Sequence, residues 1–458
     1  MPSSSDPKVS ATRGSSHWQS AVEILCYCAT STLTAALWLT YSPVEDLARA
    51  RYGWGRRVVP SLAVWGPAVS LALSPLTPRV VRSVGTRGTT TLAAVFVAAA
   101  AAARCISTAR LASIVLAHAS CGCNALGGAL VLATPSLVSR DFFDERHRIM
   151  ATSAMLAANQ LGACLGFLGA RVARRPGRLG RLLSLEAIAA AAVLACCLAR
   201  HRIWTSAAGD NDDDEDDDDE RDGGRGLVAT TPTTPTPTKR RSALGELLAS
   251  RRFVTLATAL GCSMGAFTGW QGVLFPLLRP LGWSEREASW LGFASGVGAV
   301  IAQLGAGACL LGASAATTRR ATLATLAGAA ASFAAFAALV VSRAPGNGAR
   351  LAAVFALSAG AFLVVAAEGI VYEAARAAVP RSAAAAAGAG LVVSFNVPMT
   401  AMIVAATLGA SPSALTCSLV FSTAAATALL AAVWRQEPPL GRLDPSCNTA
   451  LLPAAAHG

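Results

Sequence analysis

Amide side chains inside apolar stretches are the groups of this sequence best suited to bind a polar solute. Asn159 and Gln160 lie together near the middle of one apolar stretch, and Asn396 lies inside another in the second half of the chain. An unpaired amide in apolar surroundings costs roughly 1–3 kcal/mol, so each must hydrogen-bond to another helix, to water or to a solute. Two interpretations therefore stay open, a hydrogen bond between helices and a contact with a bound solute.

Two tryptophans form a second group of candidates. Trp38 and Trp270 lie within apolar stretches, and each is followed by a proline, Pro43 or Pro276, where a helix can bend and open a cavity. An indole face suits a flat aromatic or cationic solute, and a cation–π contact is worth about 0.5 to 2 kcal/mol. The alternative is the aromatic belt at the membrane surface, the usual position of tryptophan in membrane proteins.

Carboxylates inside an apolar stretch suggest proton chemistry. Glu368 and Glu373 lie well inside such a stretch in the second half of the chain. A buried carboxylate favours its protonated form and could bind and release a proton during a transport cycle. Arg376 lies about one helical turn from Glu373, so an ion pair that holds or gates the structure is the preferred alternative for that residue.

Other chemistry finds little support in the sequence. There is no Walker loop, Ser/His/Asp arrangement or HExxH motif, which argues against an ATP-driven pump and against an enzyme. His118 and Cys121 lie one helical turn apart but lack a third ligand, so packing explains them better than a metal site. The twelve cysteines lie mostly inside apolar stretches and form no CxxC pair. We therefore expect neither a cofactor nor a metal.

The composition is typical of a protein that crosses a membrane many times. Hydrophobic residues make up 53% of the chain and charged residues 14%, and the mean hydropathy is +0.50. The net charge of +12 comes from arginines that cluster at the ends of apolar stretches, where they fix topology. The lipid bilayer is thus the expected solvent, and nucleic acid is excluded as a partner.

Twelve stretches have about the 20 apolar residues that a helix needs to cross the hydrocarbon layer. Six precede residue 204: Ala21–Ser42, Val58–Leu76, Thr89–Ala103, Leu111–Val138, Met150–Ala170 and Leu182–Leu198. Six follow residue 252: Phe253–Leu278, Ala288–Gly312, Ala321–Val341, Leu351–Ala375, Ala383–Leu408 and Pro412–Trp434. The sequence therefore predicts an all-α membrane protein with twelve transmembrane helices.

A polar segment separates the two sets of helices. It contains an acidic run from Asp210 to Glu220, a Thr/Pro tract and three basic residues, so it cannot bury a core. An even number of crossings puts both tails on one side, and the distribution of Lys and Arg favours the cytosol. The expected organisation is a cytosolic tail (1–19), a six-helix bundle (20–203), a disordered acidic linker (204–252), a second six-helix bundle (253–435) and a cytosolic tail (436–458).

The two halves share landmarks at a nearly constant spacing. Trp38, Pro43 and Gly53-Trp54 recur as Trp270, Pro276 and Gly282-Trp283, and Gln160 recurs as Asn396. This pattern indicates an internal duplication and hence two pseudo-symmetric bundles. Bundles of this kind are typical of transporters in which two halves rock around a central site.

Short motifs in a consistent order carry a family resemblance over most of the membrane part. They are Trp38-Leu39-Thr40-Tyr41, Thr86-Arg87-Gly88, Pro135-Ser136, Asn159-Gln160-Leu161-Gly162 and Tyr372-Glu373. With these motifs the chain resembles the major facilitator superfamily, and within it the family of the feline leukaemia virus subgroup C receptor-related proteins. Gly269-Trp270-Gln271-Gly272-Val273-Leu274 and Trp65-Gly66-Pro67 look most like its lysosomal branch, disrupted in renal carcinoma protein 2.

The resemblance implies a major facilitator fold, alternating access and a small organic solute. Choline and ethanolamine are associated with the receptor branch, where haem has also been proposed, and a vitamin B6-type solute with the lysosomal branch. The family's cavity tryptophan falls on Trp38, its fifth-span glutamine on Gln160 and its eleventh-span glutamine at or beside Asn396. The chain departs from the family at three positions: Gly85 replaces an acidic residue, Arg376 lies near a missing second glutamate, and Asn396 is shorter than glutamine, which puts choline itself in doubt.

We therefore expect a secondary transporter that moves a choline- or ethanolamine-like amine or a vitamin B6-like compound. The expected solute-binding residues are Trp38, Asn159, Gln160, Trp270 and Asn396, and those for proton coupling or gating are Glu368, Glu373 and Arg376. Protons are the candidate coupling ion, the protein is expected to be a monomer, and its membrane is the plasma membrane or a lysosome- or vacuole-type membrane. The alternatives are a major facilitator carrier of an unrelated solute, such as haem, a drug or a sugar, and a non-transporting receptor or scaffold.

Overall fold

The computed structural model describes residues 17–106, 109–173, 176–209, 243–310, 313–342, 347–380 and 383–436. Helices make up the secondary structure of these residues, and no strand occurs among them. Most of the predicted tails and the acidic run with its Thr/Pro tract lie outside the described residues. The structure is therefore that of an all-α protein, as the sequence predicts.

The first half of the chain contains five long helices and several short ones. The long helices are α1 (His17–Leu39), α5 (Thr77–Ala103), α6 (Arg110–Leu132), α8 (Arg148–Val172) and α9 (Pro176–Gly209). The short ones are η1 (Ser42–Val44), α2 (Glu45–Tyr52), α3 (Val58–Ala63), α4 (Trp65–Leu73), α7 (Pro135–Phe142) and η2 (Glu145–His147).

The second half repeats this mixture of long and broken helices. It begins with α10 (Ala243–Ala249), α11 (Arg251–Leu260), the π-helical turn η3 (Gly261–Gly265), α12 (Ala266–Gly272), α13 (Leu274–Leu278) and η4 (Arg279–Leu281). It continues with α14 (Glu285–Cys309), α15 (Ala315–Val341), α16 (Asn347–Ala366), α17 (Glu368–Ala377), α18 (Ala384–Thr407) and α19 (Pro412–Gln436).

Eleven helical segments of the described residues are long and apolar enough to cross a membrane. The chain is thus a multi-pass membrane protein. The predicted span Val58–Leu76 appears as a shorter apolar helix, Val58–Leu73, which is interrupted between α3 and α4. Pro60 and Pro67 lie in α3 and α4, and each lacks the backbone N–H that a continuous helix would use. The count of twelve crossings therefore stays a prediction.

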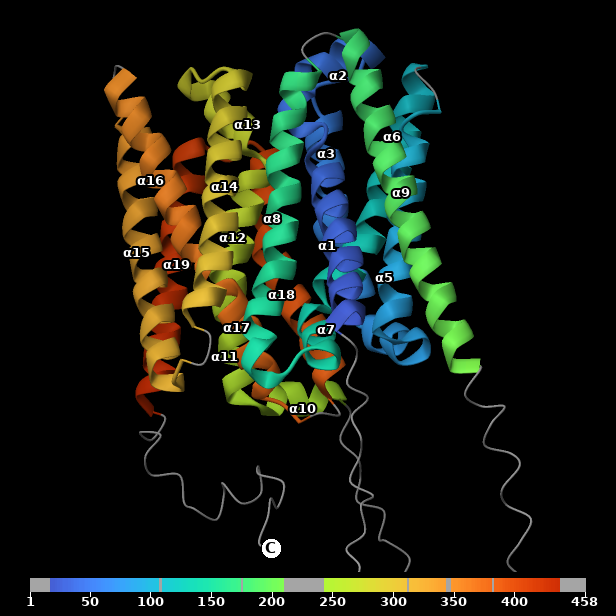
Figure 1. Ribbon diagram of the computed structural model, residues 1–458. Helices are drawn as coiled ribbons and strands as arrows, with labels where there is room; N and C mark the ends of the chain where they lie inside the picture. The colour runs from blue at the N-terminus through green and yellow to red at the C-terminus, as the bar shows by residue number, and fades with distance from the viewer. Residues whose placement is uncertain are drawn as a thin grey trace, which may run out of the picture.

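The two halves lie side by side in Figure 1, with α1 to α9 in blue to green and α11 to α19 in yellow to red. The start of α1, the end of α9, α10 and the end of α19 all lie at the lower end of the view. The halves meet where α8 packs against α14, because glycines allow close approach. A Cβ added at Gly292 would lie 2.7 Å from the Phe167 ring, and one at Gly296 would lie 2.5 Å from Cys164 Sγ.

Glycines also set the position of α12, which contributes to the site described below. Gly261 and Gly265 lie in and around the π-helical turn that precedes α12, where the chain crosses α18. A Cβ added at either glycine would clash with a backbone carbonyl oxygen, that of Ser394 or that of Phe395. Only glycine therefore lets the two backbones lie this close.

Candidate functional site

A cavity lies between the two halves of the molecule, and polar side chains form part of its wall. Its free volume is about 90 Å³, enough for several water molecules, and the whole hollow including its open mouth measures about 870 Å³. Side chains from α1, α4, α6 and α8 line it on one side, and side chains from α12, α17 and α18 on the other. Its polar and aromatic lining residues are Thr34, Trp38, Ser70, Asn124, Asn159, Gln160, Thr268, Gln271, Glu368, Tyr372, Phe395 and Asn396.

Both halves contribute predicted site residues to this cavity. Trp38, Asn159 and Gln160 come from α1 and α8 in the first half, whereas Glu368 and Asn396 come from α17 and α18 in the second. The tertiary structure thus brings together five residues that are up to several hundred positions apart in the chain. No lysine, arginine or histidine of the described residues is among those that line the cavity.

The three predicted amides differ in their hydrogen bonds. Asn159 Nδ2 donates to the backbone oxygen of Ser31 at 3.4 Å and to its hydroxyl at 3.3 Å, so this amide joins α8 to α1. Asn396 Nδ2 donates within its own helix to the Val392 oxygen at 2.8 Å. Gln160 is buried and lines the cavity, with no side-chain hydrogen bond among the described residues. Gln160 is therefore the most available of the three for a solute.

Trp38 lies at the boundary between the central cavity and a second, smaller one. Its ring lines both cavities, and Nε1 donates to the Ala63 oxygen at 3.4 Å. Glycines of both halves make room for the ring, because a Cβ added at Gly66 or at Gly272 would lie 2.8 Å from it. Trp38 is thus held between α4 and α12 at one end of the central cavity.

Trp270, predicted as a solute-binding residue, is not among the residues that line this cavity. The side chain is buried in the second half, where its ring packs edge-on against Phe336 of α15, with ring centroids 5.4 Å apart. Successive residues of a helix face directions about 100° apart, so Trp270 and its neighbour Gln271 cannot share one face of α12. Gln271 faces the cavity in its place.

Glu373 lies outside the cavity and joins the two halves. Its Oε1 accepts hydrogen bonds from Ser139 Oγ of α7 at 3.0 Å and from Thr152 Oγ1 of α8 at 2.6 Å. Its Oε2 pairs with Arg376 Nε at 3.2 Å, as the spacing of the two residues suggested. Tyr372 adds a weaker link across the same boundary, since its hydroxyl donates to the Leu132 oxygen at 3.4 Å.

Glu368 is a buried carboxylate that faces the cavity without a cationic partner. Its Oε2 accepts a hydrogen bond from Gln303 Nε2 at 3.2 Å, and the described residues contain no ion pair to Glu368. A carboxylate in a low-dielectric interior must be neutralised, by a proton or by a cation that enters the cavity.

Three further lining residues, Asn124, Thr268 and Gln271, escaped the sequence analysis. Each has a buried polar atom that finds no partner among the described residues: Asn124 Oδ1, Thr268 Oγ1 and Gln271 Nε2. Asn124 carries the signal that singled out Asn159, an amide inside an apolar stretch. Gln271 is the neighbour of Trp270 in the chain. The sequence analysis selected the tryptophan, which lies on a different face of α12 from Gln271.

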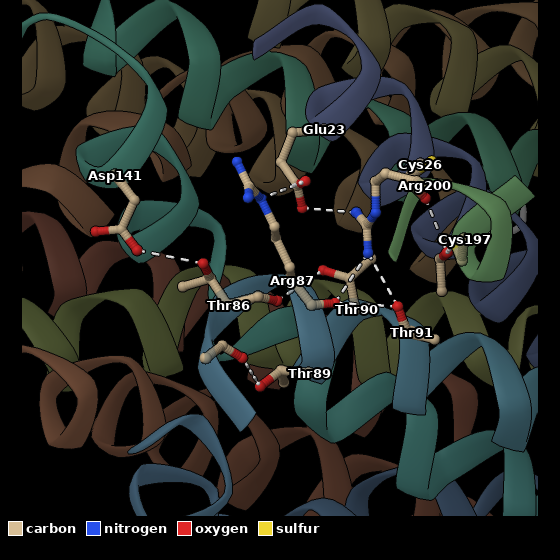
Figure 2. Close-up of polar contacts among 12 residues, drawn as sticks. Glu23, Cys26, Thr86, Arg87, Thr89, Thr90, Thr91, Asp141, Cys197 and Arg200 are labelled. Carbon is tan, nitrogen blue, oxygen red and sulfur yellow. Dashed lines mark hydrogen bonds and ion pairs between the residues drawn. The ribbon is translucent and has the colours of Figure 1, made fainter. Parts of the chain in front are cut away.

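The charged cluster shown in Figure 2 lies in the first half and takes no part in the cavity wall. Arg200 Nη1 of α9 pairs with Glu23 Oε1 of α1 at 2.7 Å, and Arg87 Nε of α5 lies 3.5 Å from Glu23 Oε2. Thr86 Oγ1 donates to Asp141 Oδ2 at 3.2 Å. Gly85 precedes these residues with φ +69°, a kink in α5 that favours glycine and explains why no acidic residue stands there. The cluster joins helices and offers no open site.

His118 takes part in a contact between helices. Trp65 Nε1 donates to His118 Nδ1 at 2.8 Å, and the two rings pack edge-on. No group of three potential metal ligands occurs in the described part of the chain.

These features define a multi-pass α-helical membrane protein with a cavity between its two halves. The chain is distantly similar to proteins named solute carrier family 49 member 4 homolog, with 24% identity over 296 residues in Xenopus tropicalis and 25% over 307 residues in Xenopus laevis. Each match covers 62% of this chain and 62% of the relative's length, so the chain matches less than two thirds of either relative. No protein-family model matches the chain.

Proposed function

We propose that this protein is a secondary transporter that moves a small organic solute through the central cavity by alternating access. The observation that supports the proposal is the cavity itself, which lies between the two halves and to which both halves contribute buried polar side chains. A solute bound there contacts both halves at once, so the rocking of one half against the other would carry it from one side to the other.

The charge of the cavity wall restricts the class of solute. Glu368 is the one charged residue among the described residues that line it. An anion would be repelled by the carboxylate and would find no cation to bind, whereas a neutral or cationic solute meets neither obstacle. An amine such as choline or ethanolamine, or a compound of the vitamin B6 type, fits this requirement, and Trp38 offers an indole face to either.

Proton coupling forms part of the proposal and is assigned to Glu368. This carboxylate lacks a cationic partner among the described residues, so it can take up a proton on one side of the membrane and release it on the other during the cycle. Glu373, by contrast, is bound by Ser139, Thr152 and Arg376, which suits a gate residue.

Transport in proteoliposomes tests the proposal directly. We expect uptake of radiolabelled pyridoxine or choline by the wild-type protein, and a fall of about tenfold or more in Trp38→Ala and Gln160→Ala, since each loses a cavity contact worth roughly 1–2 kcal/mol. Trp18→Ala is the matched control, because Trp18 is exposed on α1.

Unchanged flux in the well-folded cavity variants would remove both residues from the solute site. Haem, a drug and a sugar belong in the same solute panel, as they represent an unrelated cargo. A folded protein that moves none of these solutes would contradict transport and favour a receptor or scaffold.

The same flux assay on isolated plasma and lysosomal membranes would locate the protein, and cross-linking in the membrane would test the expected monomer.

A further inference from the structure

Three residues that line the cavity, Asn124, Thr268 and Gln271, each have a buried polar atom without a hydrogen-bond partner among the described residues. Gln271 Nε2 is a donor, Asn124 Oδ1 is an acceptor and Thr268 Oγ1 can act as either. Buried polar atoms in folded proteins almost always find partners, so each unpaired one needs an explanation. Three that share one cavity indicate a common partner inside it.

The orientation of Asn124 is fixed by its other amide atom. Asn124 Nδ2 donates to the Thr34 backbone oxygen of α1 at 2.9 Å, and this bond holds the side chain in place. Its Oδ1 is consequently left as a fixed acceptor in the first half of the molecule. A solute group that binds there must donate a hydrogen bond.

Thr268 and Gln271 lie three residues apart and thus share one face of α12. Threonines elsewhere in these helices donate to the carbonyl four residues earlier, as Thr34 does to Thr30 and Thr400 to Asn396. Thr268 makes no such bond, and the π-helical turn η3 lies directly before it. Such turns rotate the residues that follow and are frequent at functional sites.

We propose that Asn124, Thr268 and Gln271 form a hydrogen-bonding clamp that selects solutes with a hydroxyl group. A hydroxyl can donate to Asn124 Oδ1 while it accepts from Gln271 Nε2 or Thr268 Oγ1, so one group satisfies atoms of both halves. A solute without it leaves these atoms unpaired, and sites built around such bonds reject analogues that lack the group. The clamp rests on the proposed function, since it names the solute class for the same cavity.

Matched pairs of solutes test the clamp by binding to the purified full-length protein. The pairs are choline with propyltrimethylammonium, and ethanolamine with propylamine; in each pair a methyl group replaces the single hydroxyl. Ligand-induced stabilisation in thermal unfolding gives a dissociation constant for each solute. We expect wild-type protein to prefer the hydroxylated member of a pair by about tenfold or more.

Two substitutions at Gln271 distinguish a specific loss of the hydroxyl preference from a general loss of folding. Gln271→Leu removes the donor, and Gln271→Glu keeps the shape but replaces the donor by an acceptor; we expect either change to reduce the preference to about threefold or less. Thr268→Val should also reduce the preference for the hydroxylated solute. Thr427→Val is the matched control, because the Thr427 hydroxyl is already bonded to the Thr423 oxygen within α19.

Flux measured in parallel separates the two proposals. Equal binding of both members of each pair by the wild-type protein, no binding of any of the four solutes, or a wild-type preference in both Gln271 variants would overturn the clamp. Flux without a preference for the hydroxylated solute would overturn the clamp but would still support the proposed transport. A hydroxyl preference without flux would support the clamp and contradict transport.

Discussion

Glu368 differs from three other carboxylates of the long helices, Glu23, Glu186 and Glu373, in its partners. Glu23, Glu186 and Glu373 each lie within 4 Å of an arginine nitrogen, whereas Glu368 is bound by the neutral amide of Gln303. An ion pair fixes the charge of a carboxylate, and an amide does not. Of these residues, Glu368 is therefore the one to which we assign the proposed proton coupling.

The coupling role of Glu368 predicts a specific defect in Glu368→Gln. If transport of pyridoxine or choline follows a proton gradient, the variant should lose that dependence, because its side chain stays neutral and cannot release a proton. Solute exchange without a gradient should continue, since the amide keeps the shape of the carboxyl. Flux into proteoliposomes with and without an imposed pH gradient measures both effects.

A matched control for this experiment is Glu145→Gln, which changes an exposed glutamate in η2. Coupling through Glu368 would be wrong if the Glu368→Gln protein responded to the gradient as the wild-type protein does.

At the scale of elements, the first half is held together by ionic contacts at both ends. Toward the start of α1, Glu23 binds Arg200 of α9 and lies near Arg87 of α5. At the other end, Arg104 directly follows α5 and lies 3.6 Å from Glu186 of α9. Ionic contacts thus involve α5 and α9 at both levels, which favours movement of this half as one body.

The buried pair between Glu23 and Arg200 predicts a large loss of stability in Glu23→Gln. The substitution leaves the Arg200 guanidinium buried without its counter-ion, and such losses cost about 3–5 kcal/mol. The midpoint of thermal unfolding in detergent should fall by several degrees. The double variant Glu23→Leu/Arg200→Leu should recover much of the loss, because apolar residues can replace a buried pair at little cost. A midpoint within error of wild type in Glu23→Gln would show that the pair contributes little.

At the scale of the whole molecule, α17 and α18 join the second half to the first through contacts with α6, α7 and α8. Glu373 binds Ser139 and Thr152 across the boundary between the halves, and α17 lies beside α7 in Figure 1. Gly388 of α18 meets the Ala133 backbone at the end of α6, where any Cβ would clash. Alternating access requires these contacts to separate once in every cycle.

Joining the halves at these contacts should therefore stop transport. In a protein whose native cysteines are replaced by serine, Ser139→Cys/Glu373→Cys would be treated with a short cleavable bifunctional thiol reagent. We expect flux to fall to background after treatment and to return when the link is cleaved.

The control pair is Thr86→Cys/Asp141→Cys, whose parent side chains lie 3.2 Å apart within the first half. Its cross-link should leave flux unchanged. Full flux through a molecule linked between α7 and α17 would contradict rocking of the two halves.

The sequence by itself determined that the chain is a many-helix membrane protein, since hydropathy and segment length depend on composition alone. It also singled out Trp38, Gln160, Asn396 and Glu368, because a polar or aromatic group inside an apolar helix is conspicuous wherever it lies. The interruption between α3 and α4 was less visible, as prolines mark a possible break without fixing its position.

Only the tertiary structure decided which faces of these helices meet. It placed Gln271 in the cavity and Trp270 against Phe336, although the two residues are neighbours in the chain. It also left Asn124 Oδ1 unpaired while it gave Asn159 a partner in Ser31. The reason is physical: an apolar helix is hydrophobic on nearly every side, so its rotation is set by the close contacts of its neighbours, above all by glycines, and not by its own pattern.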